Sequence, residues 1–202
     1  LNQKLKDIKI FDLTRVLAGP HCTQILGDLG ADIIKIERVE TGDDTRKFAP
    51  PYMKDTDGKD TNQSAYFSGT NRNKRSLTLD LSSEEGQSIA REMISKSDIL
   101  VENFKVGTLK KYNLDYESLK DQFPDLIYCS ITGFGQTGPY ASRPAYDALV
   151  QAMGGVMSLT GEPDGEPMKV GVSIADLMAG MYATVSILAA LRQRDKTNQG
   201  QH

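Results

Sequence analysis

Apolar and polar residues alternate along the chain in blocks that predict strands and helices in turn. The apolar run between Leu5 and Leu13 predicts a buried strand. The stretch His21 to Leu29, closed by Gly30, predicts a helix, and residues 32–37 predict a second strand. A strand, a helix and a strand within about 30 residues are typical of a parallel crossover unit.

The same alternation continues through the middle of the chain. A polar segment, residues 42–64, predicts a long loop or lid. Because strands and helices alternate, we expect an α/β fold with a Rossmann-like, doubly wound and mostly parallel sheet. The further elements that the pattern predicts are strands at 76–81, 98–101 and 126–131 and a helix at 83–95.

Small residues become frequent after residue 131. Residues 133–139 form a glycine-rich loop, residues 146–157 predict a helix, and a long apolar helix begins after Ser173. This apolar run is interrupted by Asp176 and Gly180, so we interpret it as a buried helix and expect no membrane span.

Composition excludes some classes of function. The net charge is −3 and the isoelectric point about 5.5, so the chain has no overall basic field for nucleic acid. Cys22 and Cys129 lie far apart in no metal-binding spacing, and His21 and His202 cannot form a metal cluster unaided. We therefore expect no metal site, and two small core thiols in a reducing compartment.

Asp176 is the first candidate for chemistry. If Ser173 is the N-cap of the long helix, Asp176 lies in its first turn, where the helix dipole and free N–H groups favour an ionised carboxylate. Alanine and glycine around it leave space for a ligand. Acidic residues are common at helix starts, so position alone leaves a capping role and a catalytic role open.

Polar and aromatic residues follow several predicted strands, where doubly wound sheets bind ligands. Arg38 follows the second strand, residues 71–75 hold three cations, and Asn103 and Phe104 close a later strand. Cations suit phosphates and Phe104 can stack on adenine, although a solvated charge run and a core phenylalanine explain them equally well. The glycines near the first strand lack the G-x-G-x-x-G spacing, which disfavours an NAD-dependent dehydrogenase.

Six short motifs, in order over almost the whole chain, resemble family III CoA-transferases, the group of formyl-CoA transferase and the CaiB/BaiF proteins. Within that family the chain most resembles the succinate–hydroxymethylglutarate (glutarate) CoA-transferases. The motifs are residues Asp12–Pro20, Leu29–Arg38, Asn71–Ser76, Val101–Phe104, Ser130–Gly135 and Ala175–Gly180.

The resemblance implies that residues 1–202 are the N-terminal part of a Rossmann-like CoA-binding large domain ending in the long helix after Ser173. A second, smaller domain is then absent from this chain, and the full-length protein is expected to be an interlocked homodimer. Asp176 matches the family's nucleophile. The implied CoA contacts are Val16, Ala18, Arg38, Lys74, Asn103 and Phe104, and Arg75 is a further candidate for the phosphates because it lies in the same cationic run as Lys74.

The implied reaction moves CoA from an acyl-CoA donor, succinyl-CoA, to a carboxylic or dicarboxylic acid through an aspartyl-CoA thioester. The coenzyme thioester is then a substrate, and no tightly bound cofactor is expected. Two readings stay open: an α-methylacyl-CoA racemase, and a non-catalytic CoA-binding module. The racemases carry a histidine where this chain has Tyr146, and a tyrosine with a pKa near about 10 is a poor base. We expect the protein in the bacterial cytoplasm or the mitochondrial matrix, and not secreted.

Overall fold

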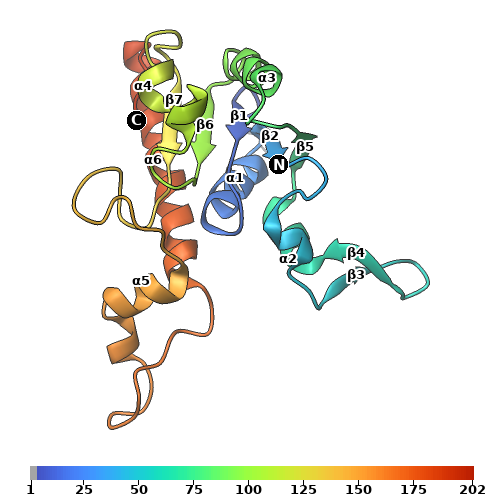
Figure 1. Ribbon diagram of the computed structural model, residues 1–202, viewed down its shortest axis with the longest axis vertical. Helices are drawn as coiled ribbons and strands as arrows, with labels where there is room; N and C mark the ends of the chain where they lie inside the picture. The colour runs from blue at the N-terminus through green and yellow to red at the C-terminus, as the bar shows by residue number, and fades with distance from the viewer. Residues whose placement is uncertain (1–3) are drawn as a thin grey trace.

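A five-stranded parallel sheet forms the centre of the computed structural model, which describes residues 4–202 (Figure 1). The order across the sheet is β5-β2-β1-β6-β7, and every neighbouring pair is parallel. The predicted α/β fold with a mostly parallel sheet is therefore confirmed. The strands are β1 (Lys9–Asp12), β2 (Asp32–Glu37), β5 (Lys74–Thr78), β6 (Ile99–Glu102) and β7 (Ile127–Ser130).

The strand order reverses beside β1, and this reversal positions the site. The chain runs from β1 through β2 to β5 on one side, then crosses back to place β6 and β7 on the other side of β1. In doubly wound sheets, ligands bind in the crevice beyond the carboxyl ends of the strands at such a point. The segments that follow β1 and β6, residues 13–17 and 103–108, flank this crevice.

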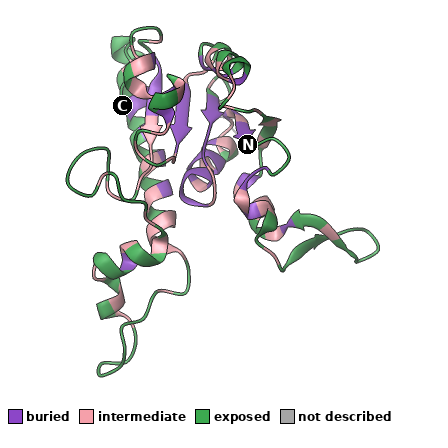
Figure 2. Ribbon diagram, viewed as in Figure 1, coloured by how far each residue is buried: buried purple, intermediate pink, exposed green. Residues whose placement is uncertain are grey.

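Helices cover both faces of the sheet because neighbouring residues of each strand point to opposite sides. On β1, Ile10 belongs to the core beneath α1 (Ala18–Asp28) and α6 (Ile174–Thr197). The next residue, Phe11, belongs to the core beneath α3 (Glu84–Ile94) and the short helices η2 (Leu109–Tyr112) and α4 (Tyr116–Leu119). Figure 2 shows the buried residues concentrated in the strands and in α1.

The segment predicted as a long loop or lid, residues 42–64, contains secondary structure that the sequence did not predict. The segment contains η1 (Asp44–Lys47) and a hairpin of β3 (Tyr52–Lys54) and β4 (Asp60–Ser64), and α2 (Ala65–Asn71) follows directly. Most hairpin residues are exposed, so no apolar alternation marked them as strands. The hairpin projects from the sheet (Figures 1 and 2).

Two predicted helices have different bounds. Helix α1 begins at Ala18, three residues before His21, because Pro20 is tolerated in a first turn where its missing N–H needs no partner. The helix predicted at 146–157 is divided into α5 (Asp147–Met153) and η3 (Val156–Leu159), since Gly155 between them adopts a left-handed φ of 82°.

Helix α6 begins at Ile174, as the pattern predicted, and packs against α1. By length and composition alone it is apolar enough to cross a membrane. Only 28% of its apolar stretch is buried, so the prediction of a buried helix was wrong for most of its length. Its outer face is apolar and exposed at Met178, Met181, Tyr182, Val185 and Leu188.

Candidate active site

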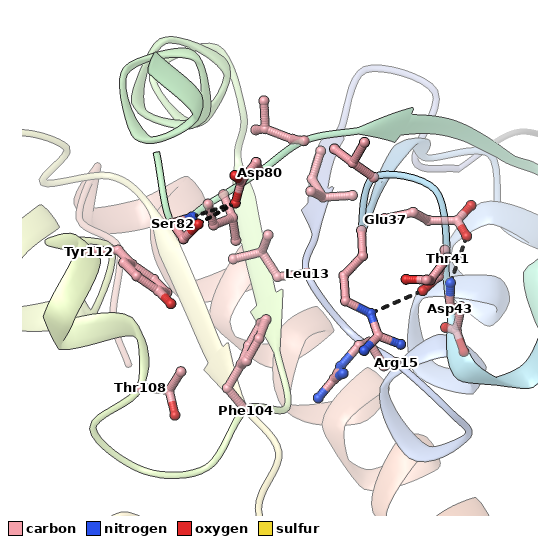
Figure 3. Close-up of a pocket in the computed structure, with 16 residues that line it drawn as sticks. Leu13, Arg15, Glu37, Thr41, Asp43, Asp80, Ser82, Phe104, Thr108 and Tyr112 are labelled. Carbon is pink, nitrogen blue, oxygen red and sulfur yellow. Dashed lines mark hydrogen bonds between the residues drawn. The ribbon is translucent and has the colours of Figure 1, made fainter. Parts of the chain in front are cut away.

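Two adjoining cavities lie at the carboxyl edge of the sheet. One has a volume of about 420 Å³ and includes Asp176 in its lining. The other, of about 440 Å³, includes Arg38 and is shown in Figure 3. Arg15 and Phe104 line both cavities, so the two are neighbours around these side chains. We call them the Asp176 cavity and the Arg38 cavity.

The structure brings most of the predicted site residues together. Val16, Ala18, Asn103 and Phe104 line the same cavity as Asp176, although up to 160 positions separate them from it in the sequence. They meet because the segments after β1 and β6 and the first turn of α6 all end at this edge. Arg38, at the end of β2, lines the adjoining cavity.

Lys74 and Arg75 do not line either cavity. The Lys74 ammonium is buried beneath α1, 2.9 Å from the Pro20 carbonyl oxygen and 3.2 Å from Asp12 Oδ2. Arg75, the next residue of β5, faces the opposite way and pairs with Asp32 on the surface. Nothing in this geometry favours the two cations as coenzyme ligands.

Asp147 holds the start of α6, the role that the sequence predicted for Ser173. Its Oδ1 accepts hydrogen bonds from the backbone N–H groups of Ala175, at 2.8 Å, and Asp176, at 3.3 Å. Ser173 makes no capping bond with its side chain. The Gln151 amide donates to the other oxygen of Asp147 at 2.6 Å and orients it. No local pattern pointed to Asp147, which lies 28 residues before Ala175.

The Asp176 carboxyl group is half-buried, and its pKa is raised, first by burial and then by the negative charge of Asp147. A raised pKa makes the ionised carboxylate a stronger base and a better nucleophile than a solvated aspartate. Gly180, one turn later, allows α6 to approach α1, because a Cβ there would lie 2.5 Å from the Ala18 carbonyl oxygen. The close approach places Asp176 beside the loop after β1.

The loop between β1 and α1 is fixed by hydrogen bonds to its backbone. The Asn103 side chain accepts from the Arg15 N–H at 2.9 Å and donates to the Arg15 carbonyl at 2.7 Å. The Asn103 amide group therefore holds the Arg15 backbone in place, and its implied contact with CoA stays a prediction. Val16, the next residue, has a left-handed φ of 69°.

The Arg38 cavity combines charge with aromatic surface. Arg38 pairs with Asp44, and the Arg15 guanidinium lies 5.4 Å from the centre of the Phe104 ring. Phe104 and Tyr112 offer faces on which a planar base can stack. The sequence missed the segment that completes this wall, residues 79–82, which directly follows β5.

Glu37 stiffens the rim of the Arg38 cavity. Burial alone would raise its pKa, but hydrogen bonds from Arg46, Ser76 and the Asp43 N–H lower that pKa to about 2. Glu37 is therefore an ionised structural anchor at neutral pH. Among residues 4–202, no cluster of histidine, cysteine, aspartate or glutamate could hold a metal ion.

A parallel α/β sheet with cavities beyond the carboxyl ends of its strands is typical of the doubly wound proteins that bind nucleotides or coenzymes. The model of CoA-transferase family III matches residues 5–202, and the chain belongs to this family. It is similar to the succinate--glutarate CoA-transferase of Agrobacterium fabrum, at 52% identity over 98% of this chain and 49% of that protein. It is also similar to the succinyl-CoA:glutarate CoA-transferase of Mus musculus, at 45% identity over 97% of this chain and 43% of that protein.

Among solved structures, the chain matches a CAIB/BAIF family protein from Brucella suis with a TM-score of 0.94 and 52% identity, over 100% of this chain and 52% of the other. The predicted family resemblance is confirmed. The chain spans about half the length of the relatives it matches.

Proposed function

We propose that this chain is the N-terminal half of a longer CoA-transferase that moves CoA from succinyl-CoA to a dicarboxylic acid through an aspartyl-CoA thioester on Asp176. The observation that carries the proposal is the meeting of the Asp176 carboxylate with the loop after β1 in one cavity, next to a second cavity lined by aromatic and cationic side chains. A nucleophile beside a coenzyme path is what covalent transfer of an acyl group requires.

The two cavities suit the two ends of CoA. The Arg38 cavity offers aromatic faces for the adenine and guanidinium groups for the phosphates. The pantetheine arm then passes Arg15 and Phe104, which line both cavities, and brings the thioester to Asp176. No tightly bound cofactor is needed in this scheme.

The proposed reaction transfers CoA through two mixed anhydrides and one aspartyl thioester. The Asp176 carboxylate attacks the thioester carbonyl of the donor, the C–S bond breaks, and a mixed anhydride and CoA thiolate form. The thiolate attacks the aspartyl carbonyl, which releases the donor carboxylate and leaves aspartyl-CoA. An acceptor carboxylate then attacks this thioester, and the two steps run in reverse to give the new acyl-CoA and free Asp176. Each backbone N–H that stabilises an oxyanion in such steps is worth about 3 kcal/mol.

A cation near Asp176 supports a dicarboxylic substrate. Arg143 lines the Asp176 cavity, and its guanidinium lies 4.2 Å from the centre of the Tyr140 ring, which orients it. Within residues 4–202 it forms no ion pair. We propose that it meets the second carboxylate of the acid, the group that succinate and glutarate share.

The exposed apolar face of α6 supports burial against further protein. We propose that the missing half of the chain and a second subunit cover it in a homodimer. We also propose a location in the bacterial cytoplasm or the mitochondrial matrix, with neither nucleic acid nor membrane as a partner.

The test is a substrate panel. The full-length enzyme is incubated with succinyl-CoA and matched mono- and dicarboxylic acids, and new CoA esters are identified by mass spectrometry. We expect esters of dicarboxylic acids, and a hydroxamate on Asp176 when hydroxylamine is added with the donor alone. Two results contradict the proposal. One is racemisation of a 2-methylacyl-CoA without transfer of CoA, and the other is binding of CoA without its transfer to any of the acids tested.

The substitution Asp147→Asn is expected to shift the pH dependence of transfer. Asparagine keeps an oxygen that accepts from the N–H groups of Ala175 and Asp176, but it removes the charge that helps to raise the pKa of Asp176. The pKa of Asp176 therefore falls, and because the ionised form is the nucleophile, the acidic limb of kcat/KM against pH moves to lower pH. The measurement is the pH profile of kcat/KM for the parent and the Asp147→Asn enzyme. If the acidic limb of the variant lies at the same pH as that of the parent, or at a higher pH, this coupling is contradicted.

A further inference from the structure

Two oppositely charged side chains meet in the interior next to both cavities. Lys35, on β2, places its Nζ 2.8 Å from Asp43 Oδ2, and the two side chains are 1% and 0% exposed. A fully buried ion pair costs several kcal/mol of desolvation per charge, so its stabilising effect depends on the further hydrogen bonds it makes. We call Lys35 and Asp43 the positioning pair.

The positioning pair contacts the loop after β1 at two points. The Lys35 ammonium donates to the Thr14 carbonyl oxygen at 2.7 Å. Asp43 Oδ1 accepts from the Val16 N–H at 3.3 Å. These two bonds fix the peptide groups on either side of Arg15, the residue that lines both cavities.

Val16 has the backbone conformation that most needs such support. Its φ of 69° is in the left-handed region, which a β-branched residue rarely adopts, at a cost on the order of 1–3 kcal/mol. Because Val16 lines the Asp176 cavity, part of the wall of this cavity is held in a conformation that the isolated loop would not prefer.

The same aspartate organises the other cavity. Asp43 Oδ1 accepts from the Thr45 N–H at 2.9 Å and from the Thr45 hydroxyl at 2.8 Å. The Asp43 N–H donates to Glu37 at 2.9 Å, and Asp43 itself lines the Arg38 cavity (Figure 3). One buried carboxylate thus connects the walls of both cavities.

We propose that Lys35 and Asp43 are positioning residues that hold Val16 in its left-handed conformation, and thereby set the place of the acyl thioester relative to Asp176. The inference rests on the proposed function. Neither side chain touches the reacting atoms. Their loss misplaces the reacting end of the coenzyme while the nucleotide end keeps most of its contacts, so kcat falls much more than KM for the donor rises.

Two double variants of the full-length enzyme separate this role from simple stability. K35M/D43L and K35M/D43N both remove the two charges, so neither leaves a lone buried charge. Asparagine keeps an oxygen that accepts from Val16 and Thr45, whereas leucine has none. We expect K35M/D43N to keep kcat within about threefold of the parent and K35M/D43L to lose on the order of 100-fold, the effect of a misplacement of about 1 Å.

Hydrogen exchange of the Val16 amide gives a readout that does not depend on activity. At a temperature well below both Tm values, this amide should exchange at least about tenfold faster in K35M/D43L than in K35M/D43N, while amides in β1 stay protected. If the leucine variant does not fold, K35M/D43A replaces it, because the smaller side chain leaves space for water around the freed N–H groups.

The outcomes are distinct. The inference is overturned if the two double variants have equal kcat, or if their Val16 amides exchange hydrogen at equal rates. It is also overturned if, in both variants, the loss of kcat is explained by the loss of Tm. If the parent enzyme transfers no CoA, the proposed function is contradicted instead. The hydrogen-exchange rate of the Val16 amide then still decides whether the positioning pair holds the loop.

Discussion

Replacing Asp176 with asparagine lowers kcat for CoA transfer by on the order of 10⁴-fold or more, the size of effect expected when a covalent nucleophile is removed. The amide has nearly the same shape and still fits the start of α6, but its nitrogen does not attack a thioester. Since Asp176 is proposed to meet only the reacting end of the substrate, the Kd for CoA should change little. Initial rates followed by chromatography of CoA esters, with Kd from calorimetry, measure both quantities.

Two controls test whether the loss of kcat comes from the missing Asp176 carboxylate itself. Asp147→Asn removes a neighbouring carboxylate without removing the proposed nucleophile, and it should keep most of the rate at its new pH optimum. Asp176→Ala and the intact mass of the asparagine protein exclude a trace of activity from deamidation. Turnover above about a tenth of the parent rate in a verified alanine protein is incompatible with an aspartyl intermediate on this residue.

The second large effect is on stability and concerns Asp12, whose carboxylate is completely buried at the end of β1. Its oxygens accept from the Thr14 N–H at 2.9 Å, the Thr14 hydroxyl at 2.5 Å and the Thr23 hydroxyl at 2.6 Å, and Lys74 Nζ lies 3.2 Å away. Asp12→Ala leaves the Lys74 charge without its carboxylate, so the free energy of unfolding should fall by about 3–5 kcal/mol. Thermal unfolding should show a Tm lower by roughly 10 °C.

The pH dependence of stability gives a further test of Asp12. Burial alone would raise its pKa, but Lys74, Lys35 and the two threonine hydroxyls outweigh burial and lower that pKa. A carboxyl group with a lowered pKa in the folded state stabilises the protein above its unfolded pKa, and this contribution is lost as the pH falls through the folded value. The Asp12→Ala protein should therefore lose less stability on acidification below about pH 4. Asp57→Ala, whose side chain is 74% exposed, is the control and should change the free energy of unfolding by less than about 0.5 kcal/mol.

The sequence predicted the parts of the site that follow directly from strand ends. Val16, Asn103 and Phe104 come just after β1 and β6, and parallel strands bring such positions to one edge. Asp176 became a candidate because Ser173, a residue type that often caps helices, placed it in the first turn of the long apolar helix. Periodicity and topology predicted where these residues lie, whereas the roles of Val16 as a CoA contact and of Asp176 as a nucleophile came from the resemblance to the family's motifs.

The parts that the sequence did not predict depend on contacts between distant segments. Asp147 caps a helix that begins 27 residues later, and Asp43 bonds to Val16 across 27 residues, so no local spacing marks either. Lys74 and Arg75 are neighbours in a cationic run, yet the alternation of β5 sends one inward to Asp12 and the other outward to Asp32. Which cation turns inward depends on the buried carboxylate that receives it.

The two cavities, which share Arg15 and Phe104, are otherwise lined by different stretches of the sequence. The Arg38 cavity is built entirely from residues 13–112, whereas the Asp176 cavity adds residues 131–150 and the start of α6. On the proposed function, substitutions in residues 131–150 change the end of the site that meets the acid and leave the lining of the Arg38 cavity, the proposed coenzyme site, unaltered.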